Sequence, residues 1–357
     1  MHTHRYRPRL AAAVAFVALA TVAVGCGSSS GSDGAKSDPT TTKPGATTTA
    51  PIDAPSKITI GYQAIPSGDL IVKQQKLLEK ALPDTKIEWK LFDSGGSVNE
   101  AFAAGGIDFG LAGSSPVSRG ISQKLPYEVV WIHDVIGKAE ALAVKSDITS
   151  LKDLVGKTIA TPFASTSHYS LLAALNNAGV DPTKVKIIDS EPDDIYAAWS
   201  NDQIDGAYVW NPNLGKIVAD GGKELITSAD LAKTGDTTYD LGVVSTSFAA
   251  KYPAVVDAWA KAQDKAVGLI HDDPDTAAEI IGAELEIPTK DAKSQLGDLI
   301  FVSAKDQAGD DYLGKELAAN LEKAAKFNKA QGEITSVADS KAYADGVDAK
   351  PAASVGG

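Results

Sequence analysis

The sequence contains one cysteine, one methionine and four arginines among its 357 residues. Cys26 follows a leader-like segment, so no disulfide, cysteine metal site or thiol nucleophile is expected in the folded part. Arg119 is the only arginine after residue 25. An anion site built on paired arginine side chains is therefore nearly excluded. Helix N-termini and hydroxyl groups would have to bind an anionic ligand instead.

The apolar run at residues 10–24 is shorter than the stretch of about 20 residues that a transmembrane helix usually needs. Arg5, Arg7 and Arg9 precede it, and Ala-Val-Gly-Cys at residues 23–26 supplies the small residues of a cleavage site. This series resembles the signal and lipobox of bacterial lipoproteins, although Cys26 could also be an incidental cysteine after an ordinary signal. We therefore expect residues 1–25 to be removed and Cys26 to be lipidated, anchoring an extracytoplasmic protein to the cell membrane.

Residues 26–55 are rich in Ser, Thr, Gly and Pro and lack aromatic residues. Such a segment has almost nothing to bury, so we expect a disordered tether.

Positive charge is scarce in the rest of the chain. Removing residues 1–25, which carry three arginines and no acid, changes the formal charge from −12 to −15. An acidic chain of this kind is a poor nucleic-acid binder. His133 and His271 have no partner at a metal-binding spacing, so we expect no metal. We also expect no cofactor.

Short apolar runs alternate with helical patterns from residue 57 onward, which predicts an α/β protein with parallel sheets. With 43% hydrophobic residues the chain can bury a sizeable core, and its length is typical of about two domains. The expected strands are residues 57–62, 86–91, 108–111, 127–135, 140–145, 158–161, 185–189, 206–209 and 240–245. The expected helices are residues 69–82, 97–104, 116–123, from 166, around 195–199, and 253–270.

Two of the expected strand-to-helix turns carry hydroxyl groups. Ser165, Thr166 and Ser167 begin one helix, with Ser165 as a candidate cap. In the other turn, Ser115 is expected at the N-cap and Pro116 at the first helical position. Both helix starts would attract anions, so the two turns could close on one ligand. The simpler alternative is that the hydroxyls only cap the helices.

Five runs occur in the order and spacing of substrate-binding proteins of taurine ABC importers, and the resemblance covers about residues 57–345. It implies a two-lobed type II periplasmic-binding-protein fold, with lobe one at residues 57–137 and 240–347 and lobe two at residues 138–239. It also implies a small-molecule ligand in the cleft, delivery to an ABC permease, and a monomer. The runs are Phe-Asp-Ser-Gly (92–95), Gly-Ser-Ser-Pro (113–116), Glu-Ala-Leu (140–142), Ser165 to Leu175, and Asp-Gly-Ala-Tyr-Val-Trp (205–210).

The resemblance suggests which residues bind the two ends of taurine, a sulfonate and an ammonium. Glu140 and Asp240, both near the implied hinge, would accept from the ammonium, whereas hydroxyl groups would donate to the sulfonate. Without the resemblance, the acids could be surface or turn residues, the aromatics core residues, and Gln63 a polar loop residue. The full set of expected ligand-binding residues is Gln63, Ser114, Ser115, Glu140, Thr166, Ser167, Tyr208, Trp210 and Asp240.

Three classes of function are compared. A binding protein for taurine or a close aminosulfonate fits the paired acids. A binding protein for another small anion, such as an alkanesulfonate or nitrate, fits less well because the acids would repel a purely anionic ligand. An enzyme is not expected: no cysteine is available to carry a porphobilinogen-deaminase-type cofactor, and no Gly-x-Ser-x-Gly elbow is present.

Overall fold

The computed structural model describes residues 52–356. The expected signal peptide, Cys26 and nearly all of the expected tether lie outside the described residues. Within residues 52–356, no helix is long and apolar enough to cross a membrane.

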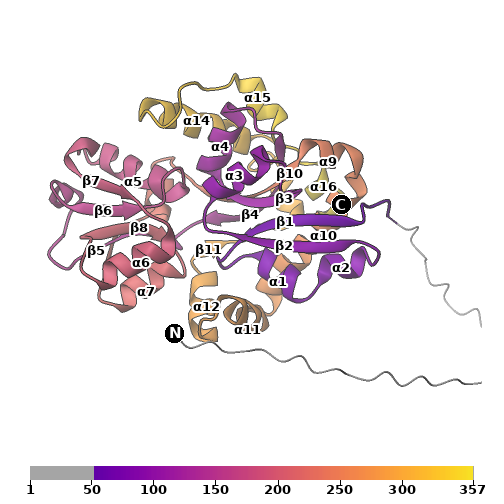
Figure 1. Cartoon of the computed structure of the whole chain (residues 1–357), viewed down its shortest axis with the longest axis horizontal. Helices are drawn as coiled ribbons and strands as arrows, with labels where there is room; N and C mark the ends of the chain where they lie inside the picture. Colours follow the sequence, from indigo (N-terminus) through magenta and orange to yellow (C-terminus); the bar gives the residue numbers. More distant parts are fainter. Residues whose placement is uncertain (1–51, 357) are drawn as a thin grey trace, which may run out of the picture. The chain divides into compact units, whose positions relative to one another are not determined.

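Two β-sheets organise the described chain (Figure 1). The six-stranded sheet has the order β11-β4-β10-β3-β1-β2, and the five-stranded sheet has the order β7-β6-β8-β5-β9. We call the part built on the first sheet half A and the part built on the second half B. The strands are β1 (Lys57–Gln63), β2 (Lys86–Phe92), β3 (Phe109–Gly113), β4 (Tyr127–Ile136), β5 (Glu140–Val144), β6 (Thr158–Thr161), β7 (Lys186–Asp189), β8 (Gly206–Trp210), β9 (Lys223–Thr227), β10 (Tyr239–Ser245) and β11 (Leu299–Ile300).

The expectation of parallel sheets is only partly correct. Strands β1, β2 and β3 are parallel, as are β6, β7 and β8. However, β10 runs antiparallel to both β3 and β4, and β5 runs antiparallel to β8 and β9. Strand β10 is antiparallel to β3 and β4 because the chain returns to the first sheet at the end where those two strands finish.

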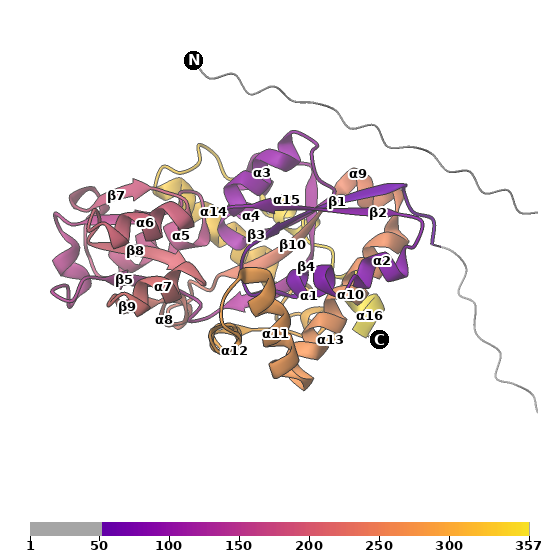
Figure 2. The same cartoon turned by 60° about the horizontal axis from the view of Figure 1, so that its bottom comes forward.

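Helices cover both faces of each sheet. In half A, α3, α4, α14 and α15 lie on one face and α1, α2 and α10 on the other (Figures 1 and 2). In half B, α5 and α8 pack on one face, and α6 and α7 on the other. The helices are α1 (Gly68–Gln74), α2 (Leu77–Ala81), α3 (Gly95–Ala103), α4 (Ser114–Ser122), α5 (Thr166–Asn177), α6 (Pro192–Ser200), α7 (Asn213–Ala219), α8 (Ser228–Ala232), α9 (Thr246–Lys251), α10 (Pro253–Asp272), α11 (Pro274–Leu285), α12 (Thr289–Leu296), α13 (Ala304–Gln307), α14 (Glu316–Ala330), α15 (Ser340–Asp345) and α16 (Lys350–Gly356).

Some elements differ from the sequence expectation. The helix expected at residues 69–82 is divided into α1 and α2, because Lys76 adopts a left-handed conformation with φ 53°. Helix α7, strand β9 and helix α8 were not expected. Strand β9 is a partly exposed edge strand with no buried residue, so it lacks the apolar pattern that marks the other strands.

The chain passes between the two sheets twice, at residues 137–139 and 233–238. The two passages are joined where the Ile136 amide donates to the Thr238 carbonyl at 3.0 Å. Gly137 must be small, because a Cβ atom there would lie 2.5 Å from the Asp298 carbonyl oxygen. The ends of β4, β5 and β10 are therefore held next to one another.

Candidate ligand-binding pocket

A pocket lies where these strand ends meet the starts of three helices. It contains about 480 Å³ of atom-free space, including its opening to solvent. Residues from both sheets and their helices contribute to it. The lining residues are Gln63, Ile65, Pro66, Gly95, Gly113, Pro116, Ile136, Ala139, Glu140, Ser165, Thr166, Trp210, Asn211, Asp240 and Leu299.

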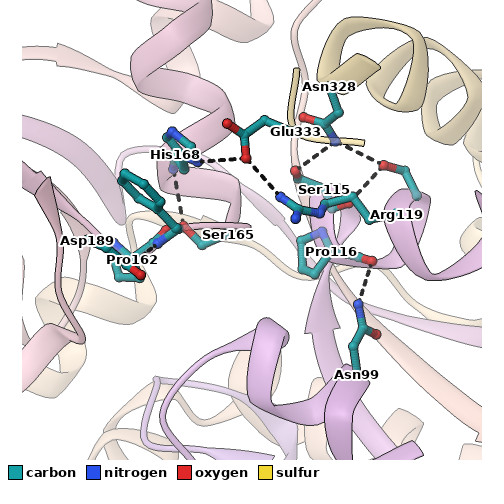
Figure 3. Close-up of polar contacts among 12 residues, drawn as sticks. Asn99, Ser115, Pro116, Arg119, Pro162, Ser165, His168, Asp189, Asn328 and Glu333 are labelled. Atoms are coloured by element: carbon teal, nitrogen blue, oxygen red, sulfur yellow. Dashed lines mark hydrogen bonds and ion pairs between the residues drawn. The ribbon is translucent and has the colours of Figure 1, made fainter. Parts of the chain in front are cut away.

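The starts of α3, α4 and α5 converge on this pocket. A Cβ atom on Gly95 would lie 2.6 Å from Cγ of Pro116, and a Cβ atom on Gly113 would lie 2.6 Å from Cγ2 of Thr166. Glycine therefore permits the close packing of α3 on α4 and of α4 on α5. Figure 3 shows Ser165 and Pro116 facing one gap from different elements. Because unpaired amides and the positive dipole ends of the helices point to a common region, this part of the pocket suits an anion.

The two expected helix caps have different outcomes. Ser165 is confirmed as the cap of α5, since its Oγ accepts from the His168 amide at 3.1 Å. The prediction for α4 is wrong: the helix begins at Ser114, Gly113 is the N-cap, and Pro116 is the third helical residue. The reason is that β3 continues to Gly113, so the helix follows the strand directly.

Glu140 is fully buried and accepts four hydrogen bonds from hydroxyl groups. The donors are Thr166 at 2.5 Å, Ser228 at 2.6 Å, Ser167 at 2.8 Å and Ser170 at 3.2 Å. Burial raises the pKa of the Glu140 carboxyl, and these hydroxyl donors act in the opposite direction. The four hydroxyl donors thus offset part of the cost of burying a negative charge at Glu140.

This arrangement corrects the role expected for two hydroxyls. The hydroxyls of Thr166 and Ser167 donate to Glu140 rather than to a ligand sulfonate. What the start of α5 offers an anion is its backbone amides, because the first-turn amides cannot bond within the helix. Thr166 lines the pocket, but Ser167 does not.

Asp240 lines the pocket beside a second aspartate that the sequence analysis missed. Asp134 of β4 is the register partner of Asp240 on β10, and it is completely buried. Burial, Asp240 and Glu140 raise the pKa of Asp134, whereas burial and Glu140 raise the pKa of Asp240 to about 7. The only sequence signal for Asp134 is an acid inside a mostly apolar strand, which alone does not show what the acid faces.

Of four other expected ligand-binding residues, one lines the pocket and three do not. Trp210 lines the pocket, whereas Tyr208 is fully buried and its hydroxyl lies 3.2 Å from Oγ of Ser228. The expected ligand contact of Tyr208 is therefore replaced by a contact with a residue that holds Glu140. Ser114 and Ser115 are also outside the lining. The Ser114 hydroxyl accepts from the Tyr239 amide at 3.2 Å, and the Ser115 hydroxyl accepts from Asn328 at 3.3 Å (Figure 3 shows the Ser115 contact).

Gln63 lines the pocket, and its side-chain amide donates to the Leu111 carbonyl at 2.9 Å. Asn211 was not expected, although it directly follows Trp210 at the end of a strand. The apolar part of the lining was also not expected, since nothing in the local sequence separates these residues from core residues. It comprises Ile65, Pro66, Ile136, Ala139 and Leu299.

Two polar contacts join halves A and B near the pocket. Glu333 accepts from Arg119 at 3.2 Å and lies 3.7 Å from Nδ1 of His168 on α5 (Figure 3). Ser94, next to the pocket residue Gly95, donates to Glu191 at 3.2 Å. Arg119 is thus paired with an acid outside the pocket lining. Among residues 52–356, no group of three or more His, Cys, Asp or Glu residues is arranged to hold a metal ion.

Comparison with protein families finds that the model described as "NMT1/THI5 like" matches residues 87–277. Among curated proteins, the taurine-binding periplasmic protein of Escherichia coli is 42% identical over 204 residues, which cover 57% of this chain and 63% of that protein. A putative aliphatic sulfonates-binding protein of Bacillus subtilis is 30% identical over 231 residues, 63% of this chain and 68% of that protein. The match to the E. coli relative thus spans slightly less than two thirds of its length.

Solved structures share the architecture. The alkanesulfonate-binding protein SsuA from Xanthomonas axonopodis pv. citri, bound to MOPS, is 25% identical with a TM-score of 0.69, covering 84% of this chain and 98% of that one. The nitrate-binding protein NrtA from Synechocystis is 14% identical with a TM-score of 0.66, covering 84% and 88%. The desulfurization enzyme DSZB is 15% identical with a TM-score of 0.61, covering 84% and 99%. The expected type II periplasmic-binding-protein fold is confirmed.

Proposed function

Because the chain belongs to the NMT1/THI5-like family, we propose that it is an extracytoplasmic protein that binds taurine or a close aminosulfonate. It would deliver this ligand to an ABC permease. We further propose that halves A and B are the two lobes that close on the ligand, with the chain passages at residues 137–139 and 233–238 as the hinge. The protein would act as a monomer and without a cofactor.

The observation that supports this ligand is that the pocket lining combines groups that favour an anion with groups that favour a cation. It contains the starts of α3, α4 and α5 together with the carboxyl groups of Glu140 and Asp240. A sulfonate is favoured where helix amides and dipoles converge, and an ammonium is favoured beside buried carboxylates. Taurine carries one group of each kind, and the E. coli relative is named for this ligand.

An alkanesulfonate is the second candidate. The names of the B. subtilis relative and the X. axonopodis structure support it. It has the same anionic group, but no cation to offset the acids of the pocket. It would bind with the acids protonated, and the raised pKa of Asp240 makes such protonation less costly.

We propose no enzymatic activity. The fold alone does not decide this, because a desulfurization enzyme shares it. The support comes from the curated relatives, which are named as binding proteins, and from the absence of any cysteine other than Cys26 in the sequence.

Lipid anchoring through Cys26 remains a proposal based on the lipobox-like residues 23–26. Cys26→Ser should move the protein from the membrane fraction into the soluble extracytoplasmic fraction, because the acyl chains would supply the anchoring energy. Fractionation followed by immunoblotting measures this change. Equal membrane retention of the variant and the native protein would contradict lipidation.

Isothermal titration calorimetry of residues 52–357 with taurine, ethanesulfonate and nitrate tests the ligand assignment. We expect taurine to bind most tightly, with a dissociation constant near micromolar, which corresponds to about −8 kcal/mol. Ethanesulfonate tests the cationic end because it lacks only the ammonium group. Tighter binding of ethanesulfonate or nitrate than of taurine would reject the aminosulfonate assignment.

A further inference from the structure

We infer that Asp134 and Asp240 share one proton in the ligand-free protein and release it when an ammonium group binds. Asp134 would then be a further specificity-determining residue of this pocket, acting through Asp240 rather than by touching the ligand. The inference rests on the proposed function, since it requires a ligand with a cationic group.

The strand pairing brings the two aspartates together. Asp240 and Asp134 are register partners on antiparallel strands, so their side chains emerge on the same face of the sheet and lie within contact range. Asp134 also shares its face of β4 with Ile136, which lines the pocket. On the other side of β10, the register partner of Asp240 is Gly113, which has no side chain. Asp134 is therefore the register partner that places a side chain beside Asp240.

Asp134 has no hydrogen-bond partner that would stabilise its negative charge. Both of its carboxyl oxygens are buried and unpartnered among the described residues. Burying an ionised carboxylate without a hydrogen-bond partner costs much free energy. A protonated carboxyl group can instead donate a hydrogen bond to a neighbouring carboxylate. Two carboxyl groups at close range commonly hold one proton between them for this reason.

The surrounding charges favour the same state. The ionisable groups that act on Asp134 are Asp240 on β10 and Glu140 on β5, and both are acids. Strand β11 on the other side of β4 contributes Leu299 and Ile300, which carry no charge. Of the basic groups near this end of β4, His133 lies 3.8 Å from Asp69 of α1, and burial lowers the pKa of His133.

Lys138 is the basic residue of the first passage between the sheets, and it acts on Asp298 and Glu224. No cation therefore compensates Asp134 among the residues described here. Glu140 differs from the aspartates, since four hydroxyl donors stabilise its charge. The proton is thus expected on the Asp134–Asp240 pair.

Binding can then be written as a balanced exchange. The ligand ammonium keeps its own protons at neutral pH. Its positive charge favours full ionisation of the pair, and the shared proton moves to bulk water. One positive charge replaces another, so the net charge of the cluster is unchanged. Ethanesulfonate brings no cation and should not release the proton.

The sign of the pH dependence follows from this exchange. When one proton is released, the affinity for taurine rises about tenfold per pH unit while the pair is still protonated. The rise ends where the ligand-free pair loses its proton, and this point lies above the range of an ordinary carboxyl group because burial and the neighbouring acids raise the pKa of both aspartates. The affinity for ethanesulfonate should stay constant or fall over the same range.

The test is calorimetry of the mature chain with taurine at about pH 6 and about pH 8, in buffers with small and large heats of ionisation. The difference in heat between buffers gives the number of protons released. We expect nearly one proton at the lower pH and a smaller number at the higher pH. Asp134→Asn should reduce the release and shift the pH dependence to lower pH, because Asp240 then has no second carboxyl group to share a proton with. Asp84→Asn, an exposed acid before β2, is the matched control and should retain both.

Each outcome decides the inference. Equal heats in both buffers at the lower pH would overturn the shared proton and leave the proposed ligand intact. Unchanged proton release by Asp134→Asn would overturn the role of Asp134. If this variant does not fold, the native measurement still decides whether a proton is released. Absence of taurine binding at every pH would overturn the proposed function and this inference with it.

Discussion

Two kinds of group in the pocket are built in different ways. The groups that suit an anion are main-chain groups at the starts of three helices, packed together through Gly95 and Gly113. The groups that suit a cation are three ionisable side chains, Glu140, Asp240 and the buried Asp134. Backbone amides do not titrate and survive most substitutions, whereas carboxyl groups respond to pH and to single mutations. Single substitutions of the acids should therefore change selectivity readily. Overall anion binding at the helix starts should be harder to change.

Glu140→Gln should have the largest effect among the changes that break this contrast. It removes a buried charge, so we expect taurine binding to weaken by about 2 to 4 kcal/mol. Ethanesulfonate should bind equally well or better. Because Glu140 raises the pKa of Asp240, the variant should also shift the pH profile of taurine binding to lower pH. Calorimetry with both ligands over a pH series measures these effects.

The control for this change is Glu279→Gln, an exposed acid on α11. It should leave both affinities unchanged. An equal loss of both ligands in Glu140→Gln, with the control unaffected, would mean that Glu140 supports the pocket structure and does not distinguish cationic ligands.

Gly113→Ala tests the helix starts. The new Cβ atom would lie 2.6 Å from Cγ2 of Thr166, so α4 and α5 must separate or Thr166 must move. We expect both taurine and ethanesulfonate to lose about 1 to 3 kcal/mol, the usual cost of overpacking. Gly268→Ala on α10 is the matched control because its Cβ atom would meet nothing within 4 Å. A loss confined to taurine would contradict the assignment of the helix starts to the sulfonate.

Thr166→Ala should have a smaller effect and sharpens the comparison. The sequence analysis assigns the Thr166 hydroxyl to the sulfonate, but in the structure it donates to Glu140. We therefore expect taurine to lose about 1 kcal/mol and ethanesulfonate to lose less. Thr166→Ser keeps the hydroxyl and should restore the affinity. If both ligands weaken equally in Thr166→Ala, the hydroxyl serves the shared anionic group after all.

The sequence predicted local features of the fold better than features that depend on strand pairing. The alternation of strands and helices and the cap at Ser165 follow from residues close together in the chain. The antiparallel course of β10 and the pairing of Asp134 with Asp240 depend on where a distant strand enters the sheet. No local pattern specifies that register, so Asp134 could not be singled out before the structure.

For the candidate site as well, the sequence identified residues better than it identified their contacts. Glu140, Trp210 and Asp240 could be named from the sequence through the family resemblance, and all three line the pocket. The resemblance did not specify which group each hydroxyl contacts. Ser167 and Tyr208 were expected at the ligand but instead hold Glu140, directly or through Ser228. Polar groups around a buried carboxylate are difficult to distinguish from ligand contacts without coordinates.

The central claim is that the pocket recognises both ends of an aminosulfonate, and Asp240→Asn tests it most directly. The substitution removes one carboxylate at the pocket wall while keeping nearly the same shape. Calorimetry should show that taurine binding weakens by about 2 to 4 kcal/mol. Ethanesulfonate should change little or bind more tightly, because a repelling carboxylate is gone. An equal loss for ethanesulfonate and taurine would show that Asp240 maintains the hinge or the fold, and would contradict recognition of the ammonium.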